Sequence, residues 1–371
     1  MKKSSFLDLA LRIATDSRWL PPPNPCVGCV ITNPDGEWLG QGHTQRAGAP
    51  HAEVMALRDA EAHGNSVVGA TAYVTLEPCS HHGRTGPCCD ALIAAGVKKV
   101  VASIADPNPL VSGQGFARLR AAGIEVEVGP GAAESRELNI GFFSRMVRKT
   151  PWVRLKVAAS LDGKTALENG LSQWITSQAA RTDGHAWRAR ASAVLTGVGT
   201  VLEDNPRLDV RLVDTPRQPH LVVVDSRLQT PPEAYIFMAG RPVWIYAAAR
   251  NDDKQAALEA RGATVTYLPD AQGKVDLAAM LRDLAVREVN ELHVEAGHKL
   301  NGSLLREGLV DEMLVYLAPK FIGDGLGIAS GAHAGGPLAT LADAMPLEFR
   351  SVQQLGPDLR IVARVAGRDA F

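Results

Sequence analysis

Runs of a single kind of residue are missing from this chain. Its 39 lysine and arginine residues nearly balance its 40 aspartate and glutamate residues, and neither sign of charge forms a cluster. The sequence therefore lacks the electrostatic surface that nucleic acids and anionic membranes require, and we expect neither as a partner. No apolar stretch reaches the roughly 18 residues of a membrane-spanning helix.

The N-terminus does not have the pattern of a signal peptide. Asp8 and Arg12 interrupt its apolar stretch, whereas Phe6, Ala10 and Ile13 recur on one face of a helix. We expect a soluble, cytoplasmic protein.

Cysteine is scarce, and its placement argues against disulfides. The chain has five cysteines, an odd number, and three of them are crowded beside two histidines between residues 79 and 89. In a cytosolic protein this crowding favours a metal site or catalysis.

The length and the order of the elements predict an α/β protein with two domains. A chain of 371 residues, 46% of them hydrophobic, exceeds what one ordinary core supports. Residues 1–147 alternate between strand-like and helix-like segments, and a second series of apolar strands and helices runs over 151–371. We place the boundary near Thr150, after one helix-like segment over 134–150, and expect 194–202 to be a strand.

The stretch between residues 79 and 89 offers more metal ligands than a zinc enzyme uses. A hydrolytic zinc site has three protein ligands and one open position for water. The five candidates in this stretch are Cys79, His81, His82, Cys88 and Cys89.

An upstream motif supplies one ligand and narrows the choice. His51 and Glu53 are expected in the first turn of a helix that follows Pro50. His-x-Glu followed by Pro-Cys and a second cysteine is the pattern of zinc-dependent nucleobase deaminases, in which the glutamate shuttles protons and does not bind zinc.

Only one of the two adjacent cysteines can face the same ion. Neighbouring residues of a helix point about 100° apart. Cys88 directly follows Pro87 at the expected start of a helix, where backbone N–H groups stabilise a thiolate. We therefore predict one zinc ion per chain, bound by His51, Cys79 and Cys88, with Cys89 turned toward the core.

Two alternatives concern these cysteines and histidines. A structural zinc knuckle could use His81 or His82 with all three cysteines. Cys26 and Cys29 form a C-x-x-C pair, but they span an apparent buried strand and are expected to be core thiols.

The motifs of both halves carry a resemblance to a known family. The first half contains "PNPCVG", "GQGHTQRAGAPHAE", "TLEPCSHHGRTGPC" and "DPNP" in this order. The second half contains "LKVAASLDGKTA", "SQWITS", "TGVGTVLEDNPRL", "VVVDSR" and "VYLAPKFIG". Together they resemble the bifunctional deaminase/reductase family of riboflavin biosynthesis.

The resemblance implies a fold and a reaction for each domain. Residues 1–147 would form a zinc-dependent deaminase with a cytidine-deaminase-like α/β/α sandwich. Residues 151–371 would form an NADPH-dependent reductase with a dihydrofolate-reductase-like α/β fold. The expected reactions are deamination of 2,5-diamino-6-(5-phosphoribosylamino)pyrimidin-4-one, a small molecule, and reduction of its ribosyl chain to ribityl. A homodimer is also implied.

The resemblance also assigns individual residues. Glu53 would be the catalytic acid and base, and His51, Cys79 and Cys88 the zinc ligands. The deaminase substrate would contact Asn24, His43, Arg84, Asp106 and Asn108. NADPH would contact Ala158, Trp174, Thr200, Asp204, Ser226, Gly297 and Lys299. The reductase substrate would contact Ser172, Arg188, Leu208, Arg211 and Glu295.

Some of these residues also have a purely structural interpretation. Asn24 and His43 could simply shape loops, Trp174 could belong to the core, and Arg188 and Lys299 could be solvated surface cations. The cofactor segment departs from the family pattern, since His298 and Lys299 stand where Pro-Thr is usual and Ala158 stands where glycine is common.

Two other functions fit parts of the sequence. One is a nucleic-acid base deaminase with an unrelated appended domain, against which the balanced charge argues. The other is a zinc-stabilised binding protein, against which Glu53 argues, because a structural zinc site needs no proton shuttle.

Overall fold

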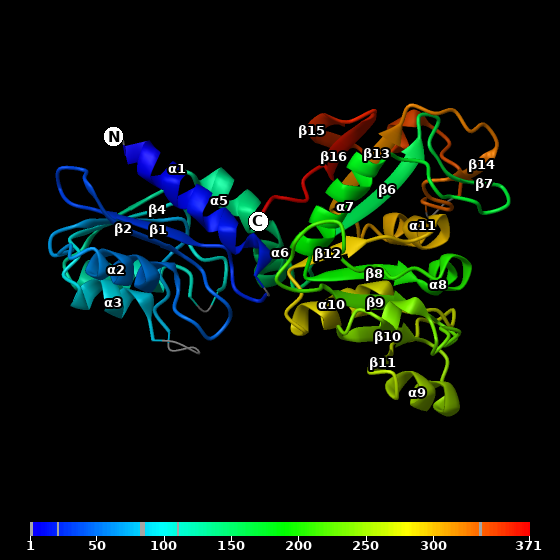
Figure 1. Ribbon diagram of the computed structural model, residues 1–371, viewed down its shortest axis with the longest axis horizontal. Helices are drawn as coiled ribbons and strands as arrows, with labels where there is room; N and C mark the ends of the chain where they lie inside the picture. The colour runs from blue at the N-terminus through cyan, green and yellow to red at the C-terminus, as the bar shows by residue number, and fades with distance from the viewer. Residues whose placement is uncertain (1–2, 21, 82–85, 110, 334–335) are drawn as a thin grey trace. The chain divides into compact units, whose positions relative to one another are not determined.

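The computed structural model describes residues 3–20, 22–81, 86–109, 111–333 and 336–371. The chain divides into two compact units (Figure 1). The first comprises Met1–Lys149 and Phe371, and the second comprises Thr150–Ala370. Within the described ranges, none of the helices combines the length and the apolar character that crossing a membrane requires.

The first unit is built on a five-stranded sheet with the order β2-β1-β3-β4-β5. β1 pairs antiparallel with β2 and β3, whereas β3, β4 and β5 are parallel. Its strands are β1 (Gly28–Thr32), β2 (Trp38–His43), β3 (Thr71–Val74), β4 (Lys99–Ala102) and β5 (Glu125–Val128). Its helices are α1 (Lys3–Ala14), η1 (Thr15–Trp19), α2 (Ala52–Ala62), α3 (Cys88–Ala94), α4 (Gln114–Ala121), α5 (Ala132–Leu138) and α6 (Ile140–Arg148).

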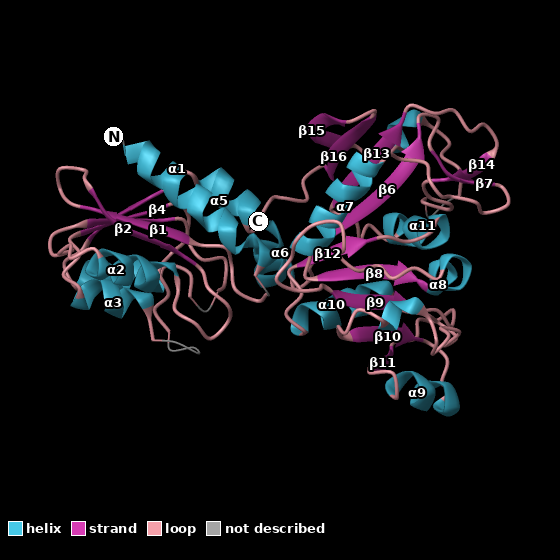
Figure 2. Cartoon of the chain, in the orientation of Figure 1, coloured by secondary structure: helices cyan, strands magenta, loops and turns pink. Residues whose placement is uncertain are grey.

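Alternation along the central strands explains why helices cover both faces of this sheet. On β1, Cys29 and Ile31 join a buried cluster with residues of α2 and α3, whereas Val30 joins Phe6 and Ala10 of α1 on the opposite face. Figure 2 shows α1 on the other side of the sheet from α2 and α3. This is the expected α/β/α sandwich.

The second unit contains a nine-stranded sheet with the order β11-β10-β9-β8-β12-β6-β13-β16-β15. The strands from β11 through β13 in this order are parallel, and β16 and β15 continue the sheet antiparallel. The large-sheet strands are β6 (Trp152–Ser160), β8 (Ala193–Gly197), β9 (His220–Val224), β10 (Val243–Ala247), β11 (Ala263–Tyr267), β12 (Glu291–Val294), β13 (Glu312–Ala318), β15 (Leu347–Leu355) and β16 (Asp358–Val365).

Helices cover both faces of the large sheet, and a two-stranded sheet flanks it. The small sheet pairs β7 (Lys164–Leu167) with β14 (Gly325–Gly327). The helices are α7 (Gln178–Arg190), α8 (Val198–Asp204), η2 (Tyr235–Phe237), α9 (Asp252–Glu259), α10 (Leu277–Val286), α11 (His298–Arg306) and η3 (Leu341–Asp343).

The two faces of β6 differ in character. Val153 and Leu155 join the main apolar core with residues of α10 and α11. Arg154 points the other way, toward α7, where its guanidinium lies 4.4 Å from the ring centroid of Trp187. The helix α7 therefore covers a face of the sheet that carries charged side chains.

Two predicted elements differ from the structure. The segment 194–202 is not one strand: β8 ends at Gly197 and α8 follows at once, with Val201 buried in the same core cluster as Val194 of β8. The helix expected over 134–150 is two helices, α5 and α6, which meet at Asn139. Apolar spacing alone does not reveal either break, because both sides of each break contribute to the core.

Candidate active sites

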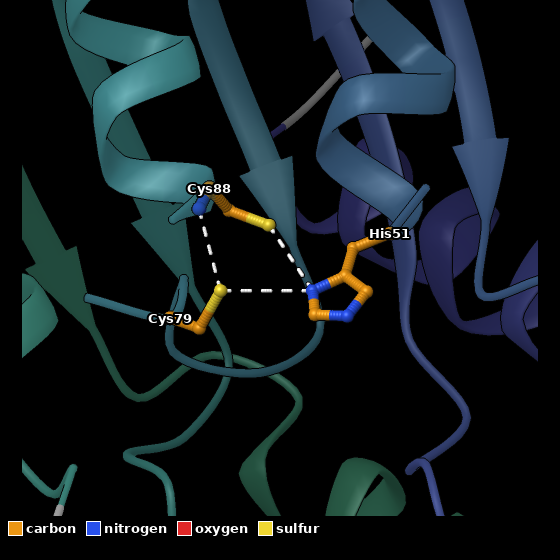
Figure 3. A group of neighbouring side chains, drawn as sticks. All are labelled: His51, Cys79 and Cys88. Atoms are coloured by element: carbon orange, nitrogen blue, oxygen red, sulfur yellow. Dashed lines mark hydrogen bonds between the residues drawn. The ribbon is translucent and has the colours of Figure 1, made fainter. Parts of the chain in front are cut away.

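Three candidate metal ligands come together from three separate segments of the first unit (Figure 3). His51 precedes the first turn of α2, Cys88 opens α3, and Cys79 lies in the loop after β3. His51 Nδ1 is 3.3 Å from Cys88 Sγ and 3.6 Å from Cys79 Sγ. Tetrahedral zinc, with Zn–S near 2.3 Å and Zn–N near 2.0 Å, requires separations of about 3.6 Å. The spacing fits zinc.

The charges of this group also fit a cation. A hydrogen bond from the Cys88 thiol lowers the pKa of Cys79 to about 4, and the same contact together with burial raises the pKa of Cys88. The backbone N–H of Cys88 also donates to Cys79 Sγ at 3.3 Å. Two facing sulfurs can both ionise only beside a strong positive charge, such as a bound metal ion.

Cys89 does not point toward this group. Its thiol donates to the carbonyl oxygens of Pro78, at 3.2 Å, and Gly115, at 3.5 Å, and the residue is fully buried. Among the described residues, the cluster able to hold a metal consists of His51, Cys79 and Cys88.

Glu53 lies in the first turn of α2, two residues after His51, and is almost completely buried. Burial, followed by the negative charge of Cys79, raises the pKa of Glu53 to about 7. A carboxyl group with this pKa can both accept and release a proton near neutral pH.

The remaining histidines and thiols of the two alternatives differ in their exposure. His81 is exposed, and His82 lies outside the described residues. Cys29 is fully buried within β1, in agreement with its interpretation as a core thiol. Cys26 differs from the same interpretation, because it precedes β1 and is only partly buried.

The other residues expected around the deaminase substrate lie on loops and strand ends. Asn24 is partly buried near Cys26, whose backbone N–H and carbonyl both pair with the side chain of Asn139. His43 ends β2 and lines a cavity of about 530 Å³. Arg84 lies outside the described residues.

Asp106 and Asn108 are joined to each other. The Asp106 carboxylate accepts a hydrogen bond from the backbone N–H of Asn108 at 2.8 Å. Burial raises the pKa of Asp106 to about 6, and the nearby charge of Glu77 acts in the same direction.

In the second unit, the candidate substrate residues gather at the carboxyl ends of the parallel strands, the usual ligand edge of such sheets. Glu295 follows β12 and forms an ion pair with Arg188 of α7, with Nη2 to Oε2 at 2.9 Å. Lys156 Nζ lies 3.4 Å from the same carboxylate. Burial opposes the ionisation of Glu295, but the charges of Arg188 and Lys156 outweigh it and lower its pKa.

A second set of contacts connects this pair to the segment after α8. Arg188 donates to the carbonyl oxygen of Asp209 at 3.0 Å, and Arg211 forms an ion pair with the Asp209 carboxylate at 2.8 Å. The ring of His185 accepts a hydrogen bond from the backbone N–H of Arg211 and lies 3.4 Å from Arg188 Nη1. Leu208, in the same segment, adopts a left-handed conformation with φ of 51°.

Arg188 is therefore an internal ion-pair partner and not a surface cation. Trp174, in contrast to its interpretation as a core residue, is 60% exposed, and Arg181 lies over its ring at 4.5 Å. Ser172, in the same segment, is partly buried.

The expected cofactor residues lie at or near the same carboxyl edge. Ala158 is on β6, Thr200 and Asp204 are on α8, and Ser226 follows β9. Gly297 is the N-cap of α11, and a Cβ atom at this position would lie 3.9 Å from Thr200 Oγ1. Lys299 is exposed in the first turn of α11.

Three further polar or charged residues of this group were not predicted from the sequence: Lys156, His185 and Asp209. Lys156 could have been found, because it belongs to the "LKVAAS" motif and alternates with the apolar residues of β6. His185 and Asp209 give no local signal. Their roles depend on contacts between α7 and a distant loop.

Comparisons with known proteins cover both units. Residues 1–104 match the family model "Cytidine and deoxycytidylate deaminase zinc-binding region", and residues 151–361 match the model "RibD C-terminal domain". The chain is 45% identical to riboflavin biosynthesis protein RibD of Escherichia coli, over 97% of this chain and 98% of the relative. It is 40% identical to RibD of Aquifex aeolicus, over 96% and 97%.

Solved structures agree with these matches. RibD of Acinetobacter baumannii has a TM-score of 0.87 and 38% identity, with 98% of each chain covered. The diaminohydroxyphosphoribosylaminopyrimidine deaminase/5-amino-6-(5-phosphoribosylamino)uracil reductase of Thermotoga maritima has a TM-score of 0.85 and 32% identity, again over 98% of each chain. The resemblance inferred from the motifs is confirmed, and the chain belongs to the RibD family of bifunctional deaminase/reductase enzymes of riboflavin biosynthesis.

Proposed function

We propose that residues 1–147 are the deaminase domain and residues 151–371 the reductase domain of this enzyme. The first would hydrolyse the amino group of 2,5-diamino-6-(5-phosphoribosylamino)pyrimidin-4-one. The second would reduce the ribosyl chain to give 5-amino-6-(5-phosphoribitylamino)uracil. The observation that carries this proposal is the convergence of His51, Cys79 and Cys88 beside the buried Glu53.

In the deaminase domain, His51, Cys79 and Cys88 would hold one zinc ion. Zinc with one open position is a Lewis acid that makes water nucleophilic near neutral pH. Glu53 takes a proton from the attacking water and passes a proton to the departing ammonia. Its position in the first turn of α2, buried beside the metal ligands, suits both transfers.

The deaminase substrate would be held by the loops around this site. Asn24, His43, Asp106 and Asn108 would contact it, and Arg84 would meet its phosphate, since a guanidinium suits phosphate oxygens.

In the reductase domain, NADPH supplies the hydride. The start of α11 suits the phosphates of NADPH, because the N-cap residue Gly297 has no side chain to cap the first-turn N–H groups. The hydroxyl of Thr200 lies close to Gly297 in the fold, and Lys299 follows two residues later in the sequence. The proposed NADPH contacts are Ala158, Trp174, Thr200, Asp204, Ser226, Gly297 and Lys299.

The reductase substrate would bind at the charged group on the carboxyl edge. The proposed contacts are Ser172, Arg188, Leu208, Arg211 and Glu295. Arg188 orients the Glu295 carboxylate by bonding both of its oxygens, and Asp209 orients the guanidinium of Arg211. The substrate therefore meets side chains whose positions are already fixed.

Two variants test the division of labour. Glu53→Gln keeps the size of the side chain but removes the proton shuttle, a change typically worth on the order of 10²-fold or more in rate. It should retain zinc, fail on the diaminopyrimidinone and still reduce the deaminated phosphoribosylaminouracil at near the parent rate. Arg211→Ala should release ammonia normally and consume NADPH slowly. Loss of reduction in a folded Glu53→Gln variant would contradict two independent sites.

We further propose a cytoplasmic homodimer that acts on a small molecule and binds neither nucleic acid nor membrane. The nearly equal numbers of basic and acidic residues support the absence of a polyanionic partner. The five free thiols suit a reducing compartment. The outermost strand β15 exposes Phe349 and Val352, and such an edge suits pairing with a second copy. Light scattering of the purified protein tests the dimer.

A further inference from the structure

Glu77 is a buried carboxylate in the segment between β3 and the metal ligand Cys79. Only 4% of the residue is exposed, and its two oxygens accept four backbone hydrogen bonds. Oε2 accepts from the N–H groups of Asp106, at 3.1 Å, and Gly113, at 2.9 Å. Oε1 accepts from the N–H groups of Gly115, at 2.8 Å, and Phe116, at 3.3 Å. Charge-assisted bonds of this kind compensate the burial of the charge.

These bonds give α4 a cap that its own sequence does not supply. The N-cap residue Gly113 is in the left-handed conformation, with φ of 78°, and has no side chain to accept from the first turn. Glu77, 38 residues away from Gly115, takes that role. The same carboxylate joins Asp106 to Gly113, so it connects the proposed substrate-binding residue to the start of the helix.

The chain around Glu77 is held from both sides. A Cβ atom on Gly115 would lie 2.1 Å from the carbonyl oxygen of Pro78, so α4 packs directly on this segment. On the other side, the N–H of Cys89 at the start of α3 donates to the carbonyl oxygen of Cys79 at 3.1 Å. The segment that carries Cys79 therefore has little freedom to move relative to α3 and α4.

We propose that Glu77 is a positioning residue for the deamination reaction, which holds the backbone of Asp106 and Asn108 in a fixed relation to the metal ligand Cys79. Asn108 depends on this arrangement through Asp106, whose carboxylate accepts its backbone N–H. The inference rests on the proposed function of Asp106 and Asn108 as substrate contacts. Glu77 itself bonds backbone groups and does not contact the substrate.

Glu77→Gln tests this role with the full-length zinc enzyme. Glutamine keeps one acceptor oxygen but places an NH₂ donor against two backbone N–H donors, so two of the four bonds are lost. The KM for the diaminopyrimidinone should rise roughly 10- to 100-fold, the range expected for losing buried bonds to a charged group. The kcat should change by less than about threefold, and one zinc per chain should remain.

Asp276→Ala is the matched control. Asp276 caps α10 in the second unit, where its carboxylate accepts from the N–H of Ala279 at 2.8 Å. This variant loses a helix cap without touching the first unit, and its KM for deamination should be unchanged. An unchanged KM in Asp276→Ala shows that losing a helix cap elsewhere in the chain does not by itself raise the deamination KM, whereas a positioning role raises this KM in Glu77→Gln.

A double-variant cycle with Asn108→Ala separates this inference from the proposed function. If Glu77 acts through the Asp106–Asn108 segment, Asn108→Ala should raise KM less in the Glu77→Gln background than in the parent. Fully multiplicative effects, an unchanged KM in Glu77→Gln, or zinc loss with unchanged KM would each overturn the positioning role. If Asn108→Ala alone leaves KM unchanged, the proposed substrate contact itself is wrong. Should Glu77→Gln fail to fold, Glu77→Asp, which keeps the charge but shortens the reach, should show the same rise in KM.

Discussion

Replacing Arg188 by alanine tests whether the ion pair with Glu295 serves the substrate or only the fold. Arg188 makes two bonds to the Glu295 carboxylate and one to the carbonyl oxygen of Asp209. The side chain of Glu295 is only 10% exposed. After the substitution, the remaining cation near Glu295 is Lys156 at 3.4 Å, which replaces the lost contacts only in part.

The loss of stability in Arg188→Ala follows from the burial of the Glu295 charge. Removing one partner of a buried ion pair costs about 3–5 kcal/mol, because the other charge is left unpaired. Since Lys156 remains, we expect the low end, about 3 kcal/mol. For a unit of 150 to 250 residues, each kcal/mol lowers Tm by about 2–4 °C, so Tm should fall by about 6–12 °C.

Arg190 supplies the control on the same helix. It forms an ion pair with Glu291 at 2.9 Å, with both side chains 12% exposed, at the amino end of β12 and away from the proposed substrate edge. Arg190→Ala should therefore lower Tm similarly and leave the kcat/KM of reduction, measured below the new Tm by NADPH absorbance, close to the parent value. Arg188→Ala should lower both Tm and the kcat/KM of reduction.

The double variant Arg188→Met with Glu295→Gln separates the two roles. Removing both charges relieves the unpaired carboxylate, so much of the stability should return. Reduction should remain impaired, because the proposed substrate contacts are still absent. Recovery of reduction together with stability would refute the reasoning and make the pair a structural feature only.

The remaining predictions concern single residues. Cys88→Ser should lose zinc and deamination together, whereas Cys89→Ser should keep both; equal zinc loss, measured by elemental analysis, would overturn the choice of ligand. Lys299→Ala should raise the KM for NADPH, because a cation in the first turn of a helix is favourable only beside an anion. This rise in KM should be smaller at high salt, which screens the interaction. An unchanged KM would mean that Lys299 is a solvated surface cation. Burial, followed by the charge of Arg188, lowers the pKa of His185 from 6.5 to about 4. Between pH 6.5 and pH 4, His185 binds a proton in the unfolded chain but not in the folded chain. As pH falls through this range, His185 should therefore lower the free energy of unfolding by up to about 3 kcal/mol. The His185→Gln variant should show a correspondingly flatter loss of Tm over this pH range.

The zinc centre could be predicted largely from sequence because its ligands occupy positions that local rules define. His51 and Cys88 both stand where a helix begins, and a proline precedes each of them. The direction of a side chain at such a position follows from helix geometry, which is why Cys88 could be chosen over Cys89 as the metal ligand. Glu77, in the same motif as Cys79, gave no such signal, because its four partners are backbone groups of a segment about 30 to 40 residues away.

The reductase site could not be predicted in the same way, because the charged face of its sheet has the sequence pattern of an exposed one. Along β12 and just beyond it, Glu291, His293 and Glu295 alternate with apolar residues, a pattern typical of a strand with one solvated face. The structure buries His293 completely and leaves the side chains of Glu291 and Glu295 only 12% and 10% exposed. The charges of the two glutamates are compensated by residues that come from other elements, such as Arg154 on β6 and Arg188 on α7. Pairing of this kind depends on β12 lying between β8 and β6, an order that differs from the order along the chain.

The same arrangement explains why one end of this charged layer is suited to catalysis and the other is not. At the amino end, Arg154 bonds both Glu291 and Glu312, and Glu312 also bonds Arg364, so each of these charges has opposite charges around it within the protein. At the carboxyl end, Glu295 lies past the last residue of β12, at the edge where loops replace strands, and its partner Lys156 is 23% exposed. A substrate can therefore approach the Glu295 group without displacing a strand, whereas the side chains of Arg154, Glu312 and Arg364 are each only 2% exposed. The ion pair proposed to meet the substrate thus differs from the structural pairs of this unit in its position along the strand, which the residue types alone do not encode.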